Sequence, residues 1–123
     1  MVEKEEKVVY IATHAGEDPE RASLPFVLAN AALAMDMKAV VALQGTGVYL
    51  AKKGYIENVF AAGLPSLKEL VEQFLELGGK LLVCSPCIKE RQIKEEDLIN
   101  SAEIMAAAML TQELLSASIM LVY

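Results

Sequence analysis

The stretch PSLKELVEQFLELGGKLLVCSPCIKER, residues 65–91, decides the fold, because it carries the signals of a helix, a strand and a second helix in succession. Ser66 and Glu69 form a capping box, and the apolar residues after them repeat at the spacing of one buried helix face. Two glycines end this helix, and KLLVC follows as a short apolar strand. SPC then begins the second helix, with Ser85 as its N-cap. This order predicts an α/β domain.

The same alternation extends along the rest of the chain. Three more apolar runs are predicted to be strands: Lys7–Thr13, Lys38–Gln44 and Ala117–Tyr123. Helices are predicted between the strands: one from Pro19 or Ser23 to Met35, a short one that follows Gly45 and Gly47 and ends near Gly54, and one from Asn100 or Ser101 to Leu115. Residues 55–64 are predicted to be irregular or a short helix. We therefore expect a single domain over residues 1–123, with a mostly parallel sheet, helices on both faces and a Rossmann-like three-layer arrangement.

Composition and charge narrow the classes of function. The formal net charge of −6 argues against nucleic-acid binding, because phosphate contacts need clustered Lys and Arg. The apolar runs are shorter than the roughly 18 residues of a membrane span, and the charged start MVEKEEK lacks the apolar core of a signal peptide. We therefore expect a cytoplasmic protein with reduced thiols and no membrane association. The hydrophobic content of 54% indicates that apolar surface, including one side of the Ala- and Met-rich helix, is buried between subunits.

Chemically capable residues follow the ends of three predicted strands. In open parallel sheets, ligands bind in the crevice beyond the carboxyl ends of the strands. The residues just past these ends are His14, Gln44 with Gly45, and Cys84. We expect them to share one edge of the sheet, although they are far apart in the sequence.

Cys84 is the best candidate nucleophile, because it ends a strand and directly precedes a helix. The amide groups and partial positive charge at a helix N-terminus favour a thiolate, and Lys89 and Arg91 add positive charge nearby. These features predict a lowered pKa for the Cys84 thiol. Cys87, in the first helical turn, is positioned to resolve a disulfide or to receive sulfur from Cys84. The alternative is that both thiols are buried small hydrophobes without a chemical task.

Other site chemistries have weaker support in the sequence. Zinc needs four ligands, of which Cys84, Cys87 and His14 supply three, with Glu17 or Asp18 as a fourth. No second Cys/His pair completes such a site, so no metal is expected. The glycines of QGTGVYL lack the third glycine of a dinucleotide-binding loop, so no cofactor is expected either. The thioredoxin fold would require a proline later in the chain than its C-x-x-C motif. No proline follows the motif here, so that fold is not expected.

Three segments together resemble the DsrE/DsrF-like family of small sulfur-relay proteins. They are VVYIATHAGEDPERAS, AVVALQGTGVYLAKKG and GGKLLVCSPCIKERQI, and with the Ala-rich helix and last strand the resemblance covers nearly the whole chain. It implies a cytoplasmic trimer or hexamer, in some members with related subunits. It also implies that sulfane sulfur is carried as a persulfide on one cysteine and passed to a partner protein. That cysteine corresponds to Cys84, whereas Cys87 departs from the simplest members, in which this position is often Ala.

The residues and the resemblance together predict a sulfur-relay protein, either a sulfurtransferase or a sulfur carrier. The Cys84 thiolate attacks a sulfane sulfur donor, holds the persulfide and passes it to an acceptor protein. Lys89 and Arg91 favour the anionic sulfur, Cys87 is an acceptor or resolving thiol, and His14 is an optional proton carrier. The alternatives are a non-catalytic oligomeric binding module with inert thiols and a metal-binding protein.

Overall fold

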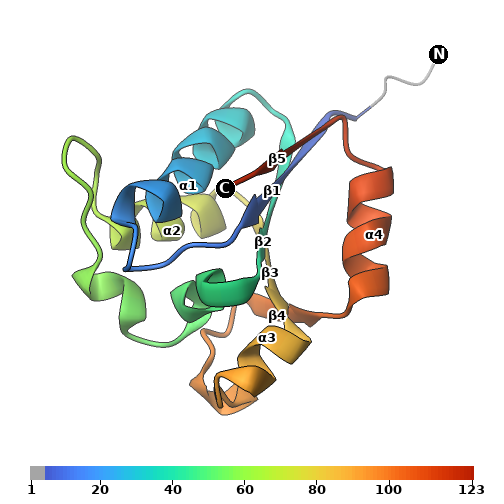
Figure 1. The fold of residues 1–123 in the computed structure, drawn as a ribbon. Helices are drawn as coiled ribbons and strands as arrows, with labels where there is room; N and C mark the ends of the chain where they lie inside the picture. The colour runs from blue at the N-terminus through green and yellow to red at the C-terminus, as the bar shows by residue number, and fades with distance from the viewer. Residues whose placement is uncertain (1–4) are drawn as a thin grey trace.

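The computed structural model of the chain describes residues 5–123, which are built around a five-stranded parallel sheet (Figure 1). The strands are β1 Lys7–Ala12, β2 Lys38–Leu43, β3 Lys80–Cys84, β4 Ala102–Met105 and β5 Ile119–Val122. Their order across the sheet is β4-β3-β2-β1-β5, and every neighbouring pair is parallel. The predicted α/β fold with a parallel sheet is therefore confirmed.

Helices connect the strands and cover both faces of the sheet. Within the described residues the α-helices are α1 Pro19–Ala34, α2 Leu67–Glu76, α3 Ser85–Glu90 and α4 Ala107–Leu115, and the short 3-10 helices are η1 Gly45–Ala51, η2 Tyr55–Asn58 and η3 Glu95–Asp97. Figure 1 shows α1 and α2 on one face, α4 on the other, and α3 with η1 at one end of the sheet. The predicted helices on both faces are therefore confirmed.

Each face of the sheet has its own apolar core. The larger core lies between the sheet and helices α1 and α2, where the rings of Phe26 and Phe74 meet edge to face with centroids 5.4 Å apart. The smaller core lies under α4, where Leu110 and Met105 pack with side chains from the three central strands. The two cores hold the strands firmly, so the carboxyl ends of β2 and β3 are fixed relative to each other.

The segment Ala102–Met105 differs from its prediction, because it is strand β4 and not the start of a helix. It pairs in parallel with β3, with Met105 opposite Cys84, and helix α4 begins only at Ala107. The sequence of this segment, AEIM, contains Ala, Glu and Met, which suit a helix by themselves. Here the open edge of β3 supplies hydrogen-bond partners, and this pairing outweighs the local preference.

The starts of α1, α2 and α3 agree with the sequence signals to within one residue. Asp18 caps α1 by accepting a hydrogen bond from the Arg21 N–H, and the helix continues through Pro25. Ser66 caps α2 by accepting from the Glu69 N–H, which is one half of the predicted capping box. The N-cap of α3 is Cys84 and not Ser85, so the last residue of β3 is also the first flanking residue of the helix.

Candidate functional site

The candidate site lies at the carboxyl ends of β2 and β3, where the chain turns into η1 and α3. Gln44 follows β2, and Gly45 then adopts a positive φ of 55°, a conformation that glycine tolerates best. Gly47 brings η1 against the carbonyl oxygen of Ala12, where a Cβ would overlap that oxygen. These glycines let η1 fold back over the sheet edge, beside the end of β3.

The two cysteines face each other at this edge. The Sγ atoms of Cys84 and Cys87 are 2.7 Å apart, and both residues are partly buried. The Gly45 N–H donates a hydrogen bond to Cys87 Sγ at 3.3 Å, which joins the turn after β2 to the cysteine pair. Arg91 Nη1 donates to the Cys87 carbonyl oxygen at 3.2 Å. The cysteines therefore form a reduced dithiol, held by contacts from the start of η1 and from the end of α3.

Cys84 also lines a cavity of about 220 Å³ between the sheet edge and the start of α4. The other residues that line it are Gln44, Pro86, Met105, Ala106, Ala107 and Leu110. Pro86 was expected only to begin a helix, and four further lining residues were not among the sequence candidates: Met105, Ala106, Ala107 and Leu110. No sequence signal marked them, because the segment that contains them was assigned to one continuous helix.

Burial raises the pKa of the Cys84 thiol, and the hydrogen bond with Cys87 raises it further. The backbone N–H of Cys87 and the charge of Arg91 act in the opposite direction but are outweighed. The expected lowering of this pKa is therefore wrong. The apolar wall from β4 and α4 limits the access of water to the thiol, and α3, with only six residues, does not compensate.

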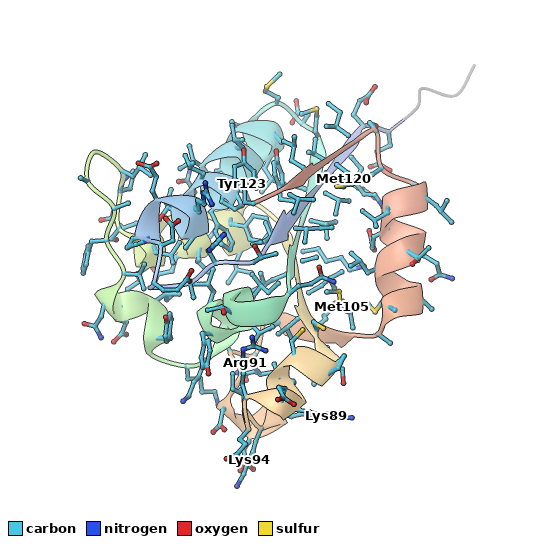
Figure 2. The ribbon with its side chains drawn as sticks, in the orientation of Figure 1. Lys89, Arg91, Lys94, Met105, Met120 and Tyr123 are labelled. Carbon is cyan, nitrogen blue, oxygen red and sulfur yellow. The ribbon has the colours of Figure 1, made fainter. Side chains whose placement is uncertain are left out.

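Arg91 and Lys89 occupy different environments, although the sequence placed both near the thiols. Figure 2 shows the Arg91 side chain turned back towards η1, whereas Lys89 extends outward from α3. Lys89 is exposed, and Arg91 is partly buried. Of the two cations, Arg91 is the one that acts on the site.

His14 lies in the loop after β1, where its Nδ1 is hydrogen-bonded to Glu17 Oε2 at 2.8 Å. Burial by itself raises the pKa of Glu17, but hydrogen bonds from His14 and the Ala15 N–H outweigh it and lower the pKa. The recorded contacts of His14 join it to this loop and not to the cysteines. The structure therefore gives no support to His14 as a proton carrier for Cys84.

Within residues 5–123, no three His, Cys, Asp or Glu side chains gather in a way that could hold a metal ion. Over the same residues, no helix is both long and apolar enough to cross a membrane.

Comparisons with known proteins agree on one family. The model of the DsrE/DsrF-like family matches residues 6–123. Uncharacterized protein MJ0989 of Methanocaldococcus jannaschii is 38% identical over 98 residues, which are 80% of this chain and 82% of that protein. Uncharacterized protein MJ0760 of the same organism is 33% identical over 86% of this chain, but the match spans only 38% of its length. Uncharacterized protein MK0008 of Methanopyrus kandleri is 32% identical over 79% of this chain and 77% of its own.

Solved structures show the same fold at low sequence identity. The YchN protein of E. coli superposes with a TM-score of 0.80 and 22% identity, over 96% of this chain and 99% of that one. MTH1491 from Methanobacterium thermoautotrophicum, titled a protein of unknown function, has a TM-score of 0.74 and 12% identity, over 95% and 99% of the two chains. At these identities the likeness concerns the fold alone.

Proposed function

The chain belongs to the DsrE/DsrF-like family, and from this premise we propose that it is a sulfur-relay protein that carries sulfane sulfur as a persulfide on Cys84. The observation that carries the proposal is the position of the Cys84 sulfur. It lies at the carboxyl edge of a parallel sheet, lines a cavity and has a second thiol beside it. This is where a sulfur donor can reach a partly buried cysteine.

The transfer is a nucleophilic exchange at sulfur. The Cys84 thiolate attacks the outer sulfur of a donor persulfide, R–S–SH, and the donor leaves as the thiolate RS⁻. Cys84 then carries the S–SH group. An acceptor thiolate attacks the outer sulfur of this group in turn, and the Cys84 thiolate is regenerated. The positive charge of Arg91 favours the anionic forms of Cys84 in this cycle.

The proposal includes partners and an assembly. A donor and an acceptor protein exchange sulfur with Cys84 in the cytoplasm, where thiols stay reduced. The chain assembles with copies of itself as a trimer or hexamer. The exposed apolar strand β5 supports this assembly, because its residues Ile119–Val122 all lie open at one edge of the sheet.

Intact-mass measurement after incubation with a persulfide or thiosulfate donor tests the proposal. We expect an adduct of about 32 Da, one sulfur atom, on a chain whose Cys87 is replaced by Ser, so that Cys84 is the only thiol. The matched variant Cys84→Ser should not acquire a stable adduct of this kind. An equal adduct on both variants, or none on either, would contradict carriage on Cys84.

A binding module with unreactive thiols is the second candidate. The raised pKa of Cys84 favours it, since a protonated thiol is a poor nucleophile. Labelling of Cys84 by a persulfide donor discriminates between the two candidates. Slow alkylation of Cys84 at neutral pH fits both, whereas failure of a persulfide donor to label Cys84 over hours fits only the binding module.

A further inference from the structure

The relay chemistry requires one cysteine, yet the site contains two in direct contact. We propose that Cys87 discharges the Cys84 persulfide as sulfide by closing a Cys84–Cys87 disulfide, so that the chain is also a persulfide reductase. The inference rests on the proposed function, because it needs a persulfide on Cys84. It assigns Cys87 the role of resolving thiol and not that of a second carrier.

Distance is the first argument. The two Sγ atoms are 2.7 Å apart, and a disulfide bond of about 2.05 Å therefore needs a movement of only a few tenths of an ångström by each sulfur. Cys84 is the N-cap of α3 and Cys87 lies in its first turn, so both sulfurs are held by the same short backbone segment. Two groups kept this close react as if at very high concentration.

The surroundings of Cys87 are the second argument. The Gly45 N–H donates to Cys87 Sγ, and such a bond stabilises negative charge on that sulfur. Arg91 is fixed by its hydrogen bond to the Cys87 carbonyl oxygen, which holds a positive charge beside the pair. These contacts hold Cys87 in the position from which its sulfur can attack Cys84.

The shape of the site is the third argument, because it separates the two sulfurs of the persulfide. Cys84 lines the cavity, so the outer sulfur that it receives lies on the cavity side. Cys87 Sγ already contacts the inner sulfur, Cys84 Sγ itself. Attack by Cys87 at the inner sulfur expels the outer one, whereas an acceptor that arrives through the cavity meets the outer sulfur.

The reaction balances without a further reactant. The Cys87 thiolate forms a bond to Cys84 Sγ, the Cys84 S–SH bond breaks, and HS⁻ leaves with the electron pair of that bond. The sulfane sulfur is reduced to sulfide by two electrons, and the two cysteine sulfurs are oxidised to a disulfide. A dithiol reductant then restores both thiols by exchange and makes the reaction catalytic.

A single-turnover experiment tests the inference. The reduced wild-type chain and the variant Cys87→Ser are loaded with inorganic polysulfide, separated from the donor without air, and followed by sulfide assay and intact mass. The wild type should release one sulfide per loaded chain and end about 2 Da below its reduced mass, because two thiol hydrogens are lost. The variant should keep its adduct of about 32 Da and release sulfide at least roughly 100-fold more slowly. The wild-type rate should not depend on protein concentration.

The outcomes separate this inference from the proposed function. If the wild type holds the adduct as long as the variant does, Cys87 does not discharge it, and carriage on Cys84 still stands. If the variant never acquires the adduct, carriage itself fails. A release rate that rises with protein concentration would mean that a second chain supplies the thiol, which overturns the intramolecular step. A second variant, Cys87→Ala, with circular dichroism of both variants, shows whether loss of folding explains a failure.

Discussion

Gly47 sets the position of the backbone amide that faces Cys87. Its α-carbon lies so close to the Ala12 carbonyl oxygen that a Cβ would have to displace either η1 or the end of β1. Since the Gly45 N–H belongs to the same turn, a displaced η1 moves this donor away from Cys87 Sγ. A residue without any chemical group therefore controls the geometry of the dithiol.

The variant Gly47→Ala should lower the free energy of unfolding by about 1–3 kcal/mol, the usual cost of overpacking. It should also slow the release of sulfide from a loaded chain. Thr46→Ala, one residue earlier, adds no atoms to the turn and serves as control. Denaturant unfolding and the sulfide assay measure both effects. If Gly47→Ala lowers the free energy of unfolding but leaves the rate of sulfide release unchanged, the turn does not control the geometry of the dithiol.

Arg91 and Lys89 provide a matched pair for the charge at Cys84. Because the charge of Arg91 lowers the pKa of this thiol, Arg91→Gln should move the pH midpoint of Cys84 alkylation upward. The thiolate is the form that reacts, so Cys84 of this variant should react more slowly at any pH below the midpoint. Lys89→Gln should leave the profile unchanged, since Lys89 extends into solvent. The rates are measured on chains that also carry Cys87→Ser, so that only Cys84 can react. Equal shifts of the pH midpoint in the two variants would contradict the conclusion that Arg91, and not Lys89, acts on Cys84.

At the scale of residues, the sequence predicted where the thiols lie but not which charges and apolar side chains surround them. The C-x-x-C motif after an apolar strand was enough to place both thiols at the sheet edge, with Gln44 and Gly45 beside them. The sequence could not rank Arg91 above Lys89, because that depends on how the chain leaves α3. Nor could it give the direction of the Cys84 pKa, because the wall that buries this thiol comes from distant residues.

Helix α4 is fastened to the amino-terminal end of the sheet by one carboxylate. Glu113 accepts hydrogen bonds from Lys7 Nζ and Lys80 Nζ, both at 2.8 Å, and thereby joins α4 to the first residues of β1 and β3. Its side chain is only 15% exposed. Burial by itself raises the pKa of Glu113, but the bonds from the two lysines outweigh it and lower the pKa.

The variant Glu113→Gln should lower the free energy of unfolding near neutral pH by about 1–2 kcal/mol, because two lysines lose a partly buried partner. The folded-state pKa of Glu113 lies below its ordinary value of 4.5, so the ionised carboxylate stabilises the fold above that pH. This contribution is lost as the pH falls through the lowered value. The stability of the variant should therefore fall less steeply on acidification than that of the wild type. Denaturant unfolding from pH 7 to pH 3 measures the free energy of unfolding at each pH. The control is Glu76→Gln, at an exposed position on α2. Parallel curves of stability against pH for Glu113→Gln and the wild type would contradict the prediction.

At the scale of elements, the apolar runs and helix caps predicted most of the order correctly. The exception was the segment Ala102–Leu115, which is strand β4 followed by helix α4. Its composition suits a helix throughout, and only the unpaired edge of β3 makes the first part extended. That pairing is a contact between distant parts of the chain, so the local pattern could not contain it. The missed strand is also the one that supplies Met105 to the cavity.

The whole molecule has an edge that is unusually apolar. Strand β5 pairs with β1 on one side, and its other side is open in the single chain. Four consecutive residues of the strand, Ile119–Val122, are exposed, and Leu115 at the end of α4 is 82% exposed. The sequence placed the expected subunit contact on the Ala- and Met-rich helix, whereas the largest group of exposed large apolar residues lies on β5. An open apolar edge favours pairing with a second copy of the chain, which would bury it.

Charge on β5 should therefore break the assembly without harming the dithiol. Val122 is 61% exposed, and the variant Val122→Lys places an ammonium where a neighbouring copy would have to bury it. The molar mass from light scattering should fall from that of a trimer or hexamer to that of one chain. Phe60→Lys is the control, because Phe60 is 64% exposed but lies in the loop between η2 and α2. Cys84 lies at the end of β3, which β2 and β1 separate from β5, so the variant should still take up sulfur from polysulfide and release it as sulfide. A wild-type chain that is already monomeric would contradict the assembly, and a monomeric variant that no longer takes up sulfur would mean that a second subunit completes the site.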